Sequence, residues 1–140
     1  MHTDIGLKGR TDVTESIIGA AFRVVNQLGC GFLEKVYENA LALELRSARH
    51  DVEQQKPIEV WYRGEKVGFY EADLVVDGCV VVELKAVAAL DRAHRAQCLN
   101  YLKACHLETG LVLNFGHTRT FSSVSLPLHF VSSVDHLSPP

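Results

Sequence analysis

Near the start of the chain, apolar positions recur every three or four residues, which is the period of helices that bury one face. From residues 13 to 28 this spacing predicts a helix, with Asp12 as its N-cap, Glu15 as the reciprocal capping residue and Gly29 as the residue that ends it. A second helix is predicted from Phe32 to Arg46. Only three residues separate the two stretches, so we expect the helices to meet at a sharp turn.

Between residues 52 and 85 the pattern changes to that of strands. Apolar residues alternate from Ile58 to Tyr62, and further apolar stretches cover residues 67–76 and 79–85. Short polar turns separate these stretches, which predicts an antiparallel meander. The third strand is apolar at every position before Glu83, so we expect it to be central and covered on both faces.

A helix and a strand follow the meander. Residues 91–105 predict the helix and residues 110–115 the strand, and a strand–helix–strand unit implies a right-handed crossover to a parallel neighbour. A last strand is expected at residues 121–125 or 128–131. The order ααβββαββ predicts an α/β fold in which helices flank a mixed sheet.

Length and composition fit one globular domain. The chain has 140 residues, of which 47% are hydrophobic and 22% charged, and a chain of this size folds without disulfides. We expect a single domain over residues 1–140, with its core at about 12–130 and loose ends at 1–10 and 132–140. No apolar stretch approaches the ~20 residues of a membrane span. The first residues form no apolar leader segment either, so the expected location is cytoplasmic.

The cysteine spacing and the net charge limit which metal ions and partner molecules we expect the chain to bind. None of the four cysteines forms a C-x-x-C pair, so we expect thiols rather than disulfides. His94 and Cys98 stand four residues apart near Cys105 and His106, but no second paired spacing supports a zinc site. The net charge of −3 excludes a protein held to nucleic acid by overall charge. A nucleic acid would need a local basic patch or a metal.

Glu83 needs a chemical explanation, because it ends the most apolar run of the chain. Lys85 lies two residues further on and so points to the same face of the strand. Buried charges are costly unless they are paired or hold an ion. The two residues therefore predict either a structural ion pair or an ion site.

The turn before Glu83 decides whether Asp73, on the preceding strand, can join it. A two-residue turn would place the two carboxylates on opposite faces of the sheet. A three-residue turn over residues 76–78 would place them on one face, and Gly78 suits the left-handed position that such a turn requires. We predict the second form, in which Asp73, Glu83 and Lys85 gather at one strand end.

Two carboxylates beside a lysine suit metal-assisted hydrolysis. The oxygen atoms of Asp73 and Glu83, with the backbone carbonyl of Leu84, are donors that Mg²⁺ or Mn²⁺ prefers. Lys85 would orient a water molecule and meet phosphate charge. This combination predicts metal-assisted hydrolysis of a phosphodiester bond.

These residues carry a family resemblance. Asp73, nine intervening residues and then Glu83-x-Lys85 resemble the PD-(D/E)XK nuclease superfamily, although Ala72 stands where a proline is usual. The stretch from Gly31 to Tyr37 reads G-x-x-E-x-x-Y and resembles the bacterial GxxExxY family, a branch of that superfamily. The resemblance covers about residues 12–130.

The resemblance implies a restriction-endonuclease-like fold and a Mg²⁺-dependent nuclease that acts on DNA. It implies four catalytic residues, Glu34, Asp73, Glu83 and Lys85. It also implies supporting roles for three residues on helices, Tyr37, Gln97 and Tyr101.

The helix after Lys85 adds a local positive charge. Between residues 85 and 106, four basic residues stand against Asp91. Three of them, Arg92, Arg95 and Lys103, are expected to face the phosphates of a nucleic acid. An ordinary solvated helix face is the alternative.

A rival interpretation is a non-catalytic module that binds nucleic acid or protein and retains the nuclease fold. The complete set of catalytic residue types favours the enzyme, whereas the short chain leaves little room for target recognition and favours the module. The sequence leaves open a homodimer, the choice between DNA and RNA, and the choice between endonuclease and exonuclease.

Overall fold

The computed structural model describes residues 7–116, 121–127 and 132–137, with side chains for residues 12–116. Its elements are α1 (Leu7–Leu28), α2 (Glu34–Ser47), β1 (Val52–Tyr62), β2 (Glu65–Val76), β3 (Val80–Lys85), α3 (Arg92–Cys105), β4 (Thr109–Asn114), β5 (Phe121–Pro127) and β6 (Ser132–Leu137). Within this described part of the chain, no helix combines the length and the apolar character that a membrane span requires.

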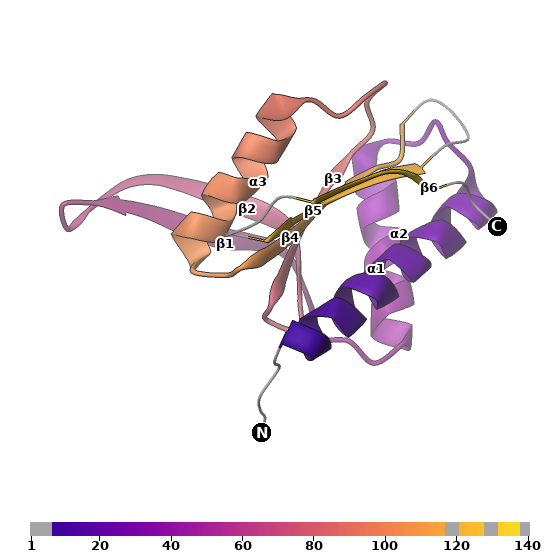
Figure 1. Ribbon diagram of the computed structural model, residues 1–140, viewed down its shortest axis with the longest axis horizontal. Coiled ribbons are helices and arrows are strands. Elements are labelled where there is room, and N and C mark those ends of the chain that lie inside the picture. Colours follow the sequence, from indigo (N-terminus) through magenta and orange to yellow (C-terminus); the bar gives the residue numbers. More distant parts are fainter. Residues whose placement is uncertain (1–6, 117–120, 128–131, 138–140) are drawn as a thin grey trace.

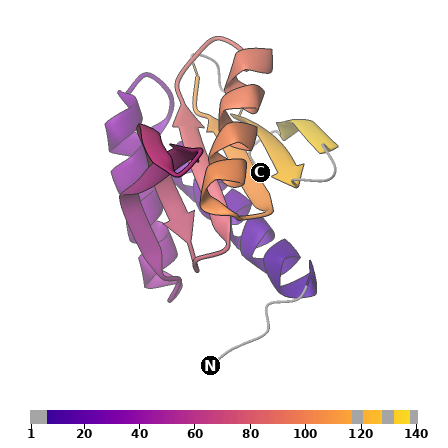
Figure 2. The same cartoon turned by 90° about the vertical axis from the view of Figure 1, so that its left-hand side faces the viewer.

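The strands form one six-stranded sheet in the order β1 to β6. Strands β3 and β4 are parallel, as the predicted crossover requires, and all other neighbours are antiparallel. Helices α1 and α2 cover one face of the sheet and α3 covers the other (Figures 1 and 2). The predicted α/β class with a mixed, helix-flanked sheet is confirmed, and the C-terminal part contains one strand more than expected.

Strand β3 lies inside the sheet and carries apolar side chains on both faces. Val80, Val82 and Leu84 pack in the core with α1 and α2, whereas Val81 packs against α3. Every residue of the strand except Lys85 is buried. The prediction of a central strand that is covered on both sides is therefore confirmed.

The prediction for the start of α1 is wrong. The helix begins at Leu7, so Asp12 lies inside it and does not cap it together with Glu15. The apolar period marked only the part of the helix that is buried, and no proline or glycine pair interrupts the helix before that part. Gly29 ends the helix as predicted, at φ +71°, a value that glycine adopts without strain.

The loose ends are also shorter than expected. Helix α1 reaches back into residues 1–10, and β6 occupies most of residues 132–140. The polar residues near the C-terminus concealed β6, because an outer strand that pairs with only one neighbour does not need an apolar run.

The turn between β2 and β3 has three residues, as predicted, but it begins one residue later than expected. Val76 pairs with Val80, so the turn consists of residues 77–79. Asp77 and Gly78 have φ values of +53° and +65°, in the left-handed region that aspartate and glycine tolerate. The register continues toward a pairing of Asp73 with Glu83, and their side chains share a face of the sheet.

Strands β1 and β2 extend beyond the rest of the sheet as a long hairpin (Figure 1). A bulge between Val60 and Trp61 interrupts its register. The outer part of the hairpin exposes large apolar side chains, namely Trp61, Tyr62, Val67, Phe69 and Tyr70.

Ser16, His50 and Asp77 form a hydrogen-bonded chain that ties α1 to the end of α2 and to the β2–β3 turn. The distance from Ser16 Oγ to His50 Nε2 is 2.7 Å, and His50 Nδ1 lies 2.7 Å from Asp77 Oδ2. The order of the groups is that of a Ser-His-Asp hydrolase triad. However, Ser16 lies inside a helix, where backbone N–H groups donate to carbonyls four residues back and cannot form an oxyanion hole. We therefore assign a structural role to the hydrogen bonds that join Ser16, His50 and Asp77.

Candidate active site

Asp73 and Glu83 meet on the face of the sheet that α3 covers. Glu83 is only 5% exposed, and its Oε1 has no hydrogen-bond partner among the described residues. Burial, followed by the negative charge of Asp73, raises the pKa of Glu83 to about 9, while Lys85 acts in the opposite direction. A cation would stabilise such a carboxylate, because it would compensate for the water that burial has removed.

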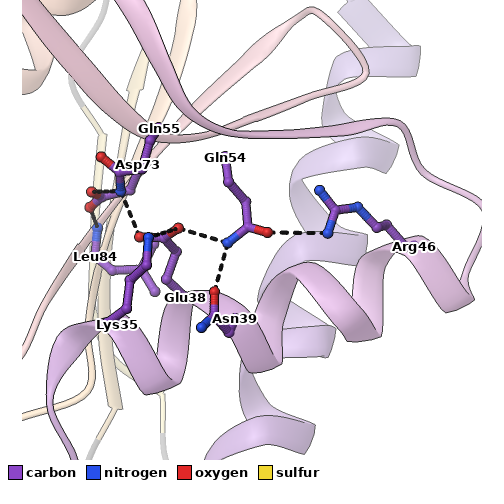
Figure 3. Close-up of polar contacts among 8 residues, drawn as sticks. All are labelled: Lys35, Glu38, Asn39, Arg46, Gln54, Gln55, Asp73 and Leu84. Carbon is purple, nitrogen blue, oxygen red and sulfur yellow. Dashed lines mark hydrogen bonds and ion pairs between the residues drawn. The ribbon is translucent and has the colours of Figure 1, made fainter.

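Asp73 is held from two sides. The backbone N–H of Leu84 donates to its Oδ2 over 2.8 Å, and Gln55 Nε2 donates to its Oδ1 over 3.2 Å (Figure 3). Gln55 has φ +51°, so β1 is irregular at the point where it faces Asp73. The neighbouring strands therefore fix the orientation of this carboxylate.

Glu38 on α2 is a buried acid that the sequence analysis missed. It is 3% exposed, and it accepts hydrogen bonds from Gln55 Nε2 at 2.6 Å, Gln54 Nε2 at 2.7 Å and Lys35 Nζ at 3.0 Å. Gln55 thus bridges the carboxylates of Glu38 and Asp73, as the close-up in Figure 3 shows. Gln55 thereby links Glu38 to the Asp73–Glu83 pair. The carboxylate oxygens of Glu38 do not themselves contact that pair.

A sequence signal for Glu38 exists. It stands three and seven residues before Leu41 and Leu45, both fully buried, so it occupies the apolar stripe of α2. An acid on such a stripe requires partners. Gln55 gave no comparable signal, because its role depends on the left-handed backbone conformation of one strand residue.

Lys85 and two residues of α3 lie on the same face as the acids. Lys85 Nζ donates to Gln97 Oε1 over 3.4 Å. Tyr101 lies one turn further along α3, and burial, together with the charges of Glu83 and Asp73, raises the pKa of its hydroxyl to about 12. The structure therefore brings Asp73, Glu83, Lys85, Gln97 and Tyr101 together.

Glu34 lies at the end of β3, at the first turn of α2. Its Oε2 accepts a hydrogen bond from the backbone N–H of Ala86 over 3.2 Å. It also lines a pocket of about 510 Å³ together with Phe115 and Gly116. Among residues with described side chains, no three acidic, histidine or cysteine side chains form a metal-holding group. The participation of Glu34 in a metal site therefore stays a prediction.

Tyr37 supports the joint that leads into Glu34. It is fully buried; its hydroxyl donates to the carbonyl of Gly29 over 2.7 Å and accepts from the N–H of Phe32 at 3.2 Å. Its ring stacks on Phe115 with a centroid distance of 4.6 Å. Tyr37 thus fixes the turn between α1 and α2, from which Glu34 follows.

Asn114 holds the segment that follows Lys85. Its side chain donates to the carbonyl of Val87 and accepts from the N–H of the same residue, both over 3.0 Å. It also accepts from the N–H of Gly116, where a Cβ atom would collide with the Val87 carbonyl. This explains why the segment Asn114-Phe115-Gly116 ends in glycine.

The basic residues of α3 lie outside the buried pair of acids. Arg92 and Lys103 are exposed and Arg95 is partly exposed. His94 is used at the helix start, where its Nδ1 accepts from the N–H of Asp91 over 3.1 Å. Whether the three bases contact phosphate stays a prediction.

The cysteine and histidine side chains do not form a zinc site in the described part of the chain. Cys98 is fully buried, and burial raises the pKa of its thiol to about 12. A neutral thiol of this kind is a poor metal ligand, since zinc binds the thiolate.

Asp73 and Glu83 fit a hard divalent cation. Mg²⁺ usually retains several water molecules and takes one or two protein carboxylates, so a third acid is not required. Glu83 Oε1 lacks a partner among the described residues. The oxygens of Asp73 accept hydrogen bonds from Gln55 and from the Leu84 N–H, and Asp73 also shares a side-chain hydrogen bond with Glu83, which a bound cation would replace. The Leu84 carbonyl stays a predicted third donor.

Comparison with known proteins gives one match. A family model described as the PD-(D/E)XK nuclease superfamily matches residues 11–124. No curated protein and no solved structure matches significantly. The matched segment contains Glu34, Asp73, Glu83 and Lys85 together with the helices that flank them.

Proposed function

This chain belongs to the PD-(D/E)XK nuclease superfamily, and we propose on this premise that it hydrolyses phosphodiester bonds in DNA with a divalent metal ion. The observation that carries the proposal is the pair of Asp73 and buried Glu83, whose Oε1 lacks a partner among the described residues. The family implies a nucleic acid as substrate. We propose DNA as this nucleic acid and a divalent ion as the cofactor.

Asp73 and Glu83 would hold Mg²⁺ or Mn²⁺, with the Leu84 carbonyl as a further donor. When bound, the ion supplies positive charge that polarises the scissile phosphate and lowers the pKa of a water molecule. Gln55 and the Leu84 N–H keep Asp73 in one orientation, which such a site requires.

Lys85 would act on the attacking water and on the phosphate. Its Nζ lies on the same face as both carboxylates, and Gln97 holds it through a 3.4 Å contact. The ammonium group would orient the water oxygen toward phosphorus, and it would interact favourably with the negative charge that grows on the phosphate oxygens as the P–O bond breaks. Glu34 would complete the site from the end of β3.

The glycine-rich joint and Tyr37 support a finer placement in the GxxExxY branch. Tyr37 makes the turn that presents Glu34, which is a physical reason for the spacing between the two residues. Arg92, Arg95 and Lys103 would guide the substrate along α3. We also propose that the protein acts in the cytoplasm.

A cleavage assay tests this proposal. Labelled single-stranded and duplex DNA and RNA are incubated with the protein and Mg²⁺ or Mn²⁺, with EDTA as the negative control. We expect cleavage of DNA that Lys85→Ala reduces by at least about 100-fold. The matched control is Arg23→Ala, which removes an exposed cation that pairs with Glu44 on the α1–α2 surface. Nucleic-acid binding without cleavage under any of these conditions would favour the non-catalytic module.

A further inference from the structure

A second concave region lies between the β1–β2 hairpin and α3. It has a volume of about 450 Å³, within the range of small-ligand pockets. The hairpin and the helix contribute four residues each. They are Glu59, Val60, Trp61 and Tyr70 from the hairpin and Asn100, Lys103, Ala104 and His106 from the end of α3.

The lining combines aromatic surface with a positive charge. Tyr70 is 44% exposed and Trp61 58% exposed, so both rings are accessible to a ligand. Glu59 is already paired with Lys66 over 3.0 Å. Lys103, exposed on α3, adds a cationic side chain to the lining beside this ion pair.

A pair of packed tyrosine rings connects this pocket with the candidate active site. The rings of Tyr70 and Tyr101 pack at 5.0 Å between their centroids, with an interplanar angle of 52°. Tyr101 lies in the electrostatic field of Glu83 and Asp73. The rings of Tyr70 and Tyr101 would therefore lie between a nucleotide in the pocket and the two acids.

We propose that this pocket binds an unpaired base of the substrate, so that the enzyme acts on single-stranded DNA or on a strand that has left the duplex. This inference rests on the proposed nuclease function and names its substrate class. A base offers a π-face to an exposed tyrosine ring, and this face is hidden by stacking in a duplex. Asn100 and His106 offer hydrogen-bonding groups to the base edge, and Lys103 binds an adjacent phosphate.

The test compares three fluorescein-labelled probes in EDTA, which prevents cleavage: oligothymidylate, an abasic oligomer of the same length and a duplex. We expect native protein to bind oligothymidylate about ten-fold more tightly than either other probe. Tyr70→Ala should abolish this preference and Tyr70→Phe should retain it, because the ring face is what matters. Lys103→Ala should weaken binding of all three probes.

The matched control is Tyr62→Ala, which removes another ring of the hairpin that is 60% exposed and does not line the pocket. It should leave the preference unchanged. Equal affinity for all probes, binding of none, or a preference that survives Tyr70→Ala in a folded protein would overturn the proposal; the last result would leave the pocket to another partner, such as a protein segment.

Cleavage in Mg²⁺ is measured in parallel to separate the two proposals. Cleavage that depends on Asp73 without base preference overturns the base pocket and leaves the nuclease standing. A base preference that depends on Tyr70 without cleavage does the reverse, because it supports the pocket and contradicts the catalytic function.

Discussion

Gln55 and Asp73 lie opposite one another on β1 and β2, and the glutamine side chain joins the aspartate to a second acid. Gln55 Nε2 donates to Asp73 Oδ1 over 3.2 Å and to Glu38 Oε1 over 2.6 Å. One amide group thus sets the position of a candidate metal ligand relative to α2. This contact makes Gln55 a positioning residue.

Gln55→Ala should lower the rate of cleavage by about ten-fold. Asp73 would lose one of the two described hydrogen bonds that orient its carboxylate, and it would leave the orientation that metal binding requires. Gln54→Ala is the matched control, since Gln54 also donates to Glu38 but does not contact Asp73. The measurement is kcat together with the Mn²⁺ concentration that gives half-maximal rate. Equal effects of the two variants on both quantities would show that Gln55 has only a structural role.

The pH dependence of stability follows from Glu83. Its pKa is about 9 in the folded chain against 4.5 as the ordinary value, so the folded metal-free protein binds a proton that the unfolded chain releases. The stabilising contribution is complete below pH 4.5 and is lost as pH rises toward 9. Between pH 4.5 and 7 it accounts for at most about 3 kcal/mol in the free energy of unfolding.

Urea unfolding of metal-free protein across this pH range measures the effect. Glu83→Gln should flatten the decline, because an amide does not titrate. Mg²⁺ should stabilise the native protein more at pH 8 than at pH 6, since the ion competes with the proton. A metal-free stability that rises with pH in the native chain, but not in the variant, would contradict this assignment.

Tyr37→Phe should destabilise the fold by about 1–2 kcal/mol, because it removes the hydroxyl that bonds to Gly29 and Phe32. The ring and its stacking on Phe115 remain. Tyr62→Phe, at a side chain that is 60% exposed, serves as the control and should have little effect. Thermal unfolding of native protein, Tyr37→Phe and Tyr62→Phe measures these differences in stability. Equal stability of all three would show that the joint between the helices does not need this hydroxyl.

Asp77→Ala should cost about 2 kcal/mol of stability and leave cleavage unaffected in the folded protein. Asp77 accepts hydrogen bonds from the partly buried His50 ring and from the exposed N–H of Asp51, and its loss would leave the His50 Nδ1 without this partner. Ser16→Ala should likewise leave cleavage unchanged. Hydrolysis of a p-nitrophenyl ester that depends on Ser16 would contradict the structural role of the hydrogen bonds that join Ser16, His50 and Asp77.

More of the fold than of the candidate site could be predicted from the sequence. The order of elements and the shared face of Asp73 and Glu83 follow from apolar periods and from the parity of one turn, and both are properties of local sequence. The turn itself begins one residue later than predicted, and Asp77 as well as Gly78 takes a left-handed conformation in it. Such a choice depends on the His50 and Asp51 contacts, which come from elsewhere in the chain.

The remaining parts of the site depend on tertiary contacts. In the sequence Gln55 is an ordinary polar residue of a strand. Its left-handed backbone conformation directs its side chain toward Asp73 and Glu38. Glu34 matches the family motif, but its described contact is with the Ala86 N–H rather than with the acids of the sheet. A motif gives residue types and spacing, whereas the distance between two elements depends on how they pack.

We propose that Asp73 and Glu83 form a metal-dependent nuclease centre. The most direct test measures Mn²⁺-dependent cleavage of labelled DNA by native protein and by Asp73→Asn and Glu83→Gln, with Mn²⁺ binding followed on the same samples. We expect native protein to bind the ion and cleave, and each variant to lose both properties while remaining folded. Cleavage that persists in either folded variant, or native protein that binds no Mn²⁺, would contradict it.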